Sequence, residues 1–160
     1  NTVESNRLRK RLSQIYPKDS KVQEDYLYNT ELQANALRKQ GKIDEAISLT
    51  SDLLKKQPEN PSHYLTLVND HLKTGDYYSA LAFAERGLIQ FPGNLSLINK
   101  KSGILAEQKR YDELIPFLQD QMKFGNRAAL QQQYNYYLLE AARSAKDKDP
   151  ATLYGKIFST

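Results

Sequence analysis

Two short stretches of this chain share a pattern and begin thirty-four residues apart: QGKIDEAI at 40–47 and TGDYYSAL at 74–81. Each has a glycine in its second position, a branched or aromatic residue two positions later, and an alanine three positions after that. A weaker third copy places Lys109, Tyr111 and Leu114 at the same spacing. A fixed period of roughly 20–50 residues is typical of a repeat architecture. We call positions that lie thirty-four residues apart a column.

Several columns hold residues that end or begin helices. Glycine just after a helix tolerates the positive φ that this position needs. Proline cannot continue the helix before it, and asparagine is a favoured helix N-cap. The residues are Gly41 and Gly75, Pro58 and Pro92, and Asn60 and Asn94, with Pro61 at a first helical position.

Apolar residues between these marks recur three and four apart, as in Ala46–Leu49–Leu53 and again from Ala80 to Leu88. Small residues at positions 46 and 80 allow two antiparallel helices to approach closely. The sequence therefore predicts an all-α fold without a stable sheet, an α-solenoid of antiparallel helix pairs.

These residues resemble the tetratricopeptide repeat, a family defined by a 34-residue period. The resemblance covers 27–60, 61–94 and a weaker 95–128. The family's alanine in the second helix matches Ala46 and Ala80, and its terminal proline matches Pro58 and Pro92. The resemblance implies a right-handed superhelix of helix pairs. The chain departs from the family at its tryptophan position, which holds Thr30, Tyr64 and Ile98, and at its small first-helix position, which holds Ala34, Val68 and Ser102.

The two ends are less regular than the repeats. Ser20 and Gln23 have the spacing of a capping box and are expected to open a long helix running to about Gln40. Residues 1–26 thus hold an N-terminal helix, marked by Leu8, Leu12 and Ile15 and ending near Pro17, and the start of the long helix. Residues 129–160 are expected to form capping helices. One has a face of Leu130, Tyr134, Leu138, Ala141 and Ala145, and a last one spans about 151–158 after a turn at KDKDP, giving about eight helices in a single domain, 1–160.

The sequence offers no constellation for catalysis, a metal or a cofactor. Cysteine is absent, and there is neither a nucleophile elbow nor a glycine-rich phosphate loop. His63 and His71 lie eight residues apart in one expected helix, so about 12 Å separates them along its axis. The acid pairs 44–45 and 112–113 open helices, where they suit the helix dipole. We therefore expect a non-enzymatic protein with no cofactor, and we expect His71 to pack like Leu37 and Leu105 in its column.

In the tetratricopeptide family, ligands usually lie along a groove lined by the first helix of each repeat. Matching the columns implies a peptide-binding groove formed by Tyr28, Glu31, Asn35, Arg38, Lys39, Leu65, Asn69, Leu72, Lys73 and Asn99. Asn35 and Asn69 share a column, and their amides suit the backbone of an extended peptide. Members that grip a chaperone's terminal carboxylate carry lysine where this chain has Glu31, and Asn99 and Gly103 supply no positive charge. A carboxylate clamp is therefore disfavoured.

The leading hypothesis from the sequence is a scaffold that binds a peptide or helix of another protein. The alternative is an RNA-binding or anionic-membrane-binding repeat, because NRLRKRL at 6–12 groups Arg7, Arg9, Lys10 and Arg11 and the net charge is +4. One or two of Tyr134, Tyr136 and Tyr137 are expected to be exposed at an interface. The chain begins at Asn1 instead of methionine, so we expect a part of a larger protein, such as an arm of an envelope secretion or biogenesis complex. Cytoplasmic and periplasmic locations are both compatible with the sequence.

Overall fold

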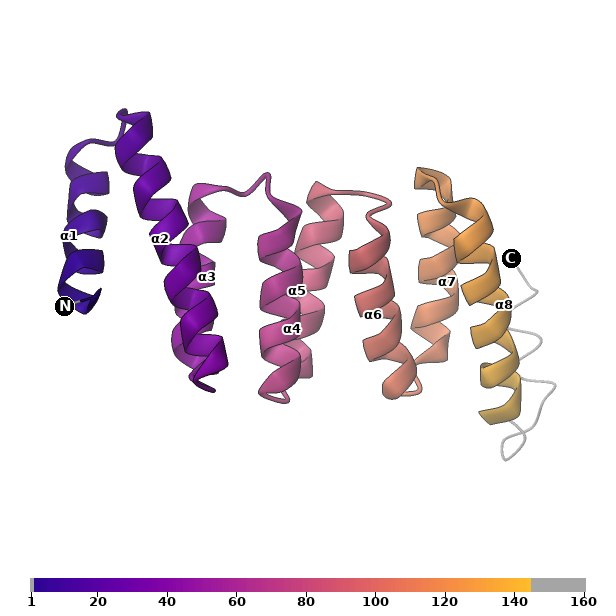
Figure 1. Ribbon diagram of the computed structural model, residues 1–160. Coiled ribbons are helices and arrows are strands. Elements are labelled where there is room, and N and C mark those ends of the chain that lie inside the picture. The colour runs from indigo at the N-terminus through magenta and orange to yellow at the C-terminus, as the bar shows by residue number, and fades with distance from the viewer. Residues whose placement is uncertain (1, 145–160) are drawn as a thin grey trace. The chain divides into compact units, whose positions relative to one another are not determined.

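The computed structural model describes residues 2–144, and side chains from residue 4 onward, and this part of the chain is built from helices and contains no strand (Figure 1). Residues 145–160, which include Ala145, the KDKDP turn and the helix expected at 151–158, lie outside the described residues. The all-α prediction is confirmed. The helices are α1 Thr2–Ile15, α2 Ser20–Lys39, α3 Ile43–Lys56, α4 Pro61–Lys73, α5 Tyr77–Gln90, α6 Leu95–Glu107, α7 Tyr111–Gln121, the 3₁₀ turn η1 Met122–Phe124, and α8 Arg127–Ser144.

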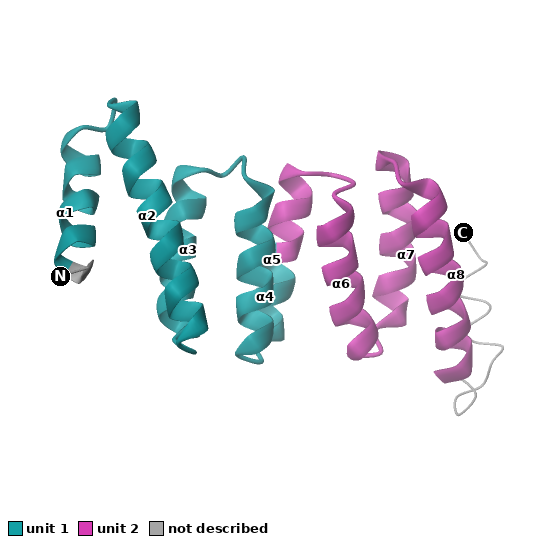
Figure 2. Ribbon diagram, in the orientation of Figure 1, with its two compact units in different colours: residues 1–83 teal, residues 84–160 magenta. Residues whose placement is uncertain are grey.

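The chain divides into two compact units, and the division falls within α5 (Figure 2). Unit 1 covers residues 1–83, and in it α1 packs on α2, α2 on α3 and α3 on α4. Unit 2 begins at Ala84, and in it α6 packs on α7 and α7 on α8.

The turn between the two helices of a pair is the same in all three repeats. Gly41 and Gly75 have φ of 76° and 77°, and Lys109 has φ of 55°. In each turn, the backbone N–H of the following residue donates to a carbonyl five positions back, the hydrogen bond of a Schellman motif. These bonds join Lys42 to Leu37, Asp76 to His71 and Arg110 to Leu105, each at 2.9 Å.

The starts of α4 and α6 follow the predicted caps. Oδ1 of Asn60 accepts from the backbone N–H of Ser62 at 3.0 Å, and Oδ1 of Asn94 accepts from that of Leu97 at 3.1 Å. Pro61 occupies the first turn of α4, as expected.

The capping box expected at the start of α2 is wrong. The N-cap is Asp19, whose carboxylate accepts from the backbone N–H of Val22 at 3.2 Å. The Gln23 side chain donates instead to the carbonyls of Ser13 at 2.7 Å and Tyr16 at 3.1 Å. Carbonyls at a helix end have no partner within their own helix, and Gln23 satisfies two of them at the end of α1.

The columns that set helix spacing are buried. Ala34 and Val68 are 0% exposed, and Ala46, Ala80 and Leu114, one column of the second helices, are also 0% exposed. The family's tryptophan column, Thr30, Tyr64 and Ile98, is likewise buried. The period therefore holds in the side-chain packing as well as in the backbone turns.

The terminal helices differ in detail from expectation. On the apolar face of α1, Leu8 and Ile15 are 58% and 56% exposed and Leu12 is half-buried, while Ser13 is buried. Polar side chains join α1 to α2: Nδ2 of Asn6 donates to Oε1 of Gln33 at 2.9 Å, and Arg9 donates to Asp25. α8 begins at Arg127, after the 3₁₀ turn η1 that follows α7. On α8, Leu130 and Ala141 are buried and Tyr134 and Leu138 half-buried, as the pattern indicated.

Candidate partner-binding face

The face suggested by the resemblance lies, within unit 1, on α2 and α4. On α2 the side chain of Tyr28 is 63% exposed, and Glu31, Asn35 and Lys39 are exposed as well. On α4 the side chains at 65, 69 and 72 are half-buried, and Lys73 is exposed. Helical spacing puts the positions of each helix on one side of it. Lys39 and Lys73 are the last residues of α2 and α4, and Glu31 stands about two turns before Lys39 on α2.

Arg38 is engaged within the protein. Its Nε lies 3.0 and 2.8 Å from the two carboxylate oxygens of Asp70, and its Nη2 lies 2.7 Å from one of them. The Asp70 side chain is 2% exposed and that of Arg38 is 14% exposed. Nη2 also donates to the hydroxyl of Thr50, which in turn donates to the carbonyl of Ala46 at 2.9 Å. One guanidinium therefore links α2, α3 and α4.

Arg38 also contacts the candidate face. Its Nη1 donates to Oδ1 of Asn35 at 3.0 Å, one helical turn before it on α2. The side chain of Asn69, the equivalent residue on α4, makes no hydrogen bond with the described residues, and Leu72 stands where α2 has the arginine. The two amides of one column thus have different surroundings.

Sequence reasoning missed Asp70 and Thr50, both of which are buried. Asp70 stands in a column with Ala36 and Ile104. A carboxylate in a column of small and apolar residues was the one indication, in the sequence, of a polar contact at this position. Burial of an unpaired carboxylate is costly, and that position therefore required a cation nearby.

Asn99 lies in unit 2 and takes part in a different contact. It is exposed on α6, and its Oδ1 accepts from Nε2 of Gln133 on α8 at 2.6 Å. Together with Gln132, Tyr136 and Tyr137, these two residues line an open cleft of about 420 Å³. Tyr136 is 58% exposed, in agreement with the expectation that one of the C-terminal tyrosines is accessible. Burial raises the pKa of Tyr137.

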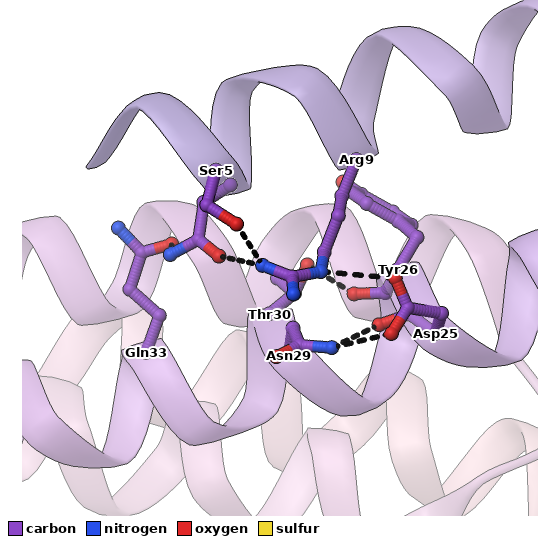
Figure 3. A network of polar contacts seen from close by, with 8 residues as sticks. Ser5, Arg9, Asp25, Tyr26, Asn29, Thr30 and Gln33 are labelled. Atoms are coloured by element: carbon purple, nitrogen blue, oxygen red, sulfur yellow. Dashed lines mark hydrogen bonds and ion pairs between the residues drawn. The ribbon is translucent and has the colours of Figure 1, made fainter. Parts of the chain in front are cut away.

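The basic cluster at 6–12 is divided between packing and solvent. Figure 3 shows the guanidinium of Arg9 between Ser5 of α1 and Asp25 of α2. Arg9 donates to Asp25 at 2.9 Å, to Ser5 at 2.6 Å and to Asn6 at 3.3 Å. Lys10 donates to Asp52 of α3 at 2.8 Å, and this hydrogen bond raises the pKa of Lys10 and lowers that of Asp52.

Arg7 and Arg11 are exposed, and their side chains have no hydrogen bond or ion pair with any described residue. Two of the four cations are therefore accessible to an anionic partner.

Both histidines are explained by packing. His63 is 4% exposed, its Nε2 lies 3.0 Å from Oε1 of Gln57 and 3.3 Å from Nδ2 of Asn60, and burial lowers its pKa. His71 is stacked on Phe83 with 5.4 Å between ring centroids.

Residues 2–144 contain no group of three or more side chains suited to a metal ion. No helix in that range combines the length and apolar character needed to span a membrane.

The sequence matches no protein-family model, and no curated protein is significantly similar to it.

Proposed function

We propose that this chain is a tetratricopeptide-like, non-enzymatic scaffold that binds an extended peptide or a helix of another protein along α2 and α4. The three Schellman turns thirty-four residues apart, with glycine or lysine at positive φ, support the family assignment. Stacked helix pairs form a fairly rigid surface, and rigidity lowers the ordering cost of binding.

The observation that carries the proposal is the contrast between faces of the first helices. Within α2, Thr30 and Ala34 are buried, while Tyr28, Glu31 and Asn35 are accessible. Within α4, Asn69 retains unused hydrogen-bonding capacity at the position equivalent to Asn35. Such a surface offers an aromatic side chain, two amides and terminal lysines to a partner's backbone and side chains.

The test is a random dodecapeptide display library selected on the wild-type chain, followed by calorimetry with the best peptide. We expect the double variant Asn35→Ala/Asn69→Ala to bind that peptide at least about tenfold more weakly, since each lost hydrogen bond contributes roughly 1 kcal/mol. Its melting temperature should change little, because neither side chain is in the core. Gln14→Ala, which removes an exposed amide from α1, is the matched control. Unchanged affinity of the double variant would contradict the groove assignment.

Binding of RNA or an anionic membrane is the second candidate, and the unpaired, exposed Arg7 and Arg11 favour it. Binding by this route falls steeply with added salt. A fluorescent polyuridylate oligomer and vesicles of phosphatidylserine and phosphatidylcholine, titrated at about 50 and 200 mM salt, measure it directly. The charge-removing pair Arg7→Gln/Arg11→Gln should abolish such binding and leave peptide affinity unchanged.

A further inference from the structure

We infer that Arg38 fixes the carboxamide of Asn35 so that α2 presents an N–H donor, and that the partner must therefore place a hydrogen-bond acceptor at this position. The inference rests on the proposed function and specifies its chemistry. It assigns Arg38, Asp70 and Thr50 as positioning residues that act through Asn35.

The orientation of the Asn35 amide follows from its neighbour. A guanidinium has five N–H donors and no acceptor. The atom of Asn35 that lies 3.0 Å from Nη1 of Arg38 must therefore be the carbonyl oxygen Oδ1. A flipped carboxamide would oppose two donors and lose a charge-assisted hydrogen bond. The NH₂ group is thereby left for solvent or a partner, and it makes no hydrogen bond with the described residues.

Arg38 is in turn held in place by buried groups. Two of its nitrogens contact the Asp70 carboxylate at 2.7–3.0 Å, and that side chain is 2% exposed. If Arg38 rotated away, it would leave a buried carboxylate without a counter-charge. One of these two nitrogens, Nη2, also donates to the hydroxyl of Thr50 on α3, and Nη1 is the nitrogen that donates to Asn35. Three helices therefore set the position of one exposed amide.

Asn69 provides an internal comparison. It stands in the same column as Asn35, but the residue three positions later is Leu72, which offers no hydrogen bond. Its carboxamide can rotate to donate or accept as a partner requires. The α2 position is thus selective for an acceptor, such as a backbone carbonyl, whereas the α4 position accepts either polarity.

A measurement without any partner tests the positioning step. Side-chain ¹⁵N relaxation of the two NH₂ groups, assigned with Asn35→Ala and Asn69→Ala, should give a clearly higher order parameter for Asn35 than for Asn69. Arg38→Lys keeps a cation beside Asp70 but lacks the planar fork. In that variant the Asn35 value should fall to the level of Asn69. Equal mobility of both amides in the wild-type chain would overturn the inference.

A binding measurement tests the polarity, with the dodecapeptide selected by display on the wild-type chain as the probe. Asn35→Asp retains an oxygen for Arg38, so the variant should melt like the parent, but it has no N–H to donate. We expect both Asn35→Asp and Asn35→Ala to weaken peptide binding about fivefold, which corresponds to the loss of one hydrogen bond. Asn69→Asp, which adds the same charge to the same face, should have a clearly smaller effect.

The outcomes separate this inference from the proposed function. If Asn35→Asp binds like the wild type while Asn35→Ala binds weakly, the partner uses the oxygen, and the inference fails while the groove stands. If Asn69→Ala and Lys73→Ala weaken binding but no Asn35 variant does, the inference fails in the same way. If no variant at 35, 69 or 73 alters affinity, the peptide binds elsewhere and both proposals fail.

Discussion

The repeat around α2–α4 and the repeat that follows it have the same backbone turn but different residues in three columns. In the first, half-buried Arg38 and buried Thr50 and Asp70 form a polar triad. Thirty-four residues later, the same columns hold Leu72, Ala84 and Ile104, all apolar. The backbone turns are the same in both, with Schellman hydrogen bonds of 2.9 Å. The Schellman turn therefore forms with or without the ion pair. The polar triad of the first repeat is an addition that the turn does not require.

The largest expected effect comes from breaking that triad. Arg38→Ala leaves the buried Asp70 carboxylate without a counter-charge, and we expect a loss of about 3–5 kcal/mol in the free energy of unfolding. Urea denaturation measures it. Because Asp70 is 1% exposed, water cannot easily compensate.

A second experiment replaces the three residues of the triad with the residues that the next repeat holds in the same columns. The triple variant Arg38→Leu/Thr50→Ala/Asp70→Ile carries the residues of the next repeat, and replacing a buried ion pair with apolar residues is often nearly neutral or stabilising. We expect the triple variant to be at least about 2 kcal/mol more stable than Arg38→Ala. Equal instability of the two variants would show that the regions are not interchangeable.

The next effect concerns the small residue that lets the helices of a pair approach. Ala80 is 0% exposed, whereas its column in unit 2 holds Leu114, also fully buried. Ala80→Phe should destabilise the chain by about 1–3 kcal/mol or more, since a filled site must be forced open. Ser48→Phe, at an exposed position on α3, is the control and should change stability by less than about 0.5 kcal/mol. A normal melting temperature for Ala80→Phe would mean that the helix pairing is wrong.

The features that could be predicted from the sequence are the local ones. A positive φ at Gly41 or a cap at Asn60 depends on residues within one turn, so the residue type alone indicates it. The cap at Asp19 was missed because Gln23 is used for a contact with the end of α1, which the local pattern does not contain.

The same limit applies to the candidate site. Helical spacing placed Asn35 on an accessible face, but nothing in the order of residues showed that Arg38 is engaged with Asp70, thirty-two positions away. A contact between separate helices depends on how they pack. The only indication of this contact in the sequence was a charged residue, Asp70, in a column that otherwise holds small or apolar residues.

A smaller effect is expected at the turn of the third repeat. Lys109 has φ of 55°, where Gly41 and Gly75 have 76° and 77°. A side chain in the left-handed region costs roughly 1–2 kcal/mol, and the greater freedom of glycine in the unfolded chain offsets part of the gain. Lys109→Gly should therefore stabilise the chain by about 0.5–1 kcal/mol, as measured by urea denaturation. Gly41→Ala is the reverse control: a Cβ there meets no atom within 4 Å, so its expected destabilisation reports φ strain alone. A loss of stability in Lys109→Gly would show that the lysine side chain contributes to the turn.

The smallest effect is a pH dependence confined to one region, because both histidines of the chain lie in unit 1. Burial lowers the pKa of His63 from its ordinary value of 6.5, although Glu31 and Glu59 oppose the shift. As pH falls through 6.5, the unfolded chain binds the proton first, so stability is fully present above that pH and declines below it. Hydrogen exchange of α4 amides should therefore accelerate relative to α6 amides between about pH 7.5 and 5, after correction for the intrinsic rate. In a His71→Gln background, which removes the other imidazole, His63→Gln should abolish this acceleration of α4 exchange relative to α6 exchange. Parallel profiles for α4 and α6 in the wild-type chain would refute a stability difference set by His63.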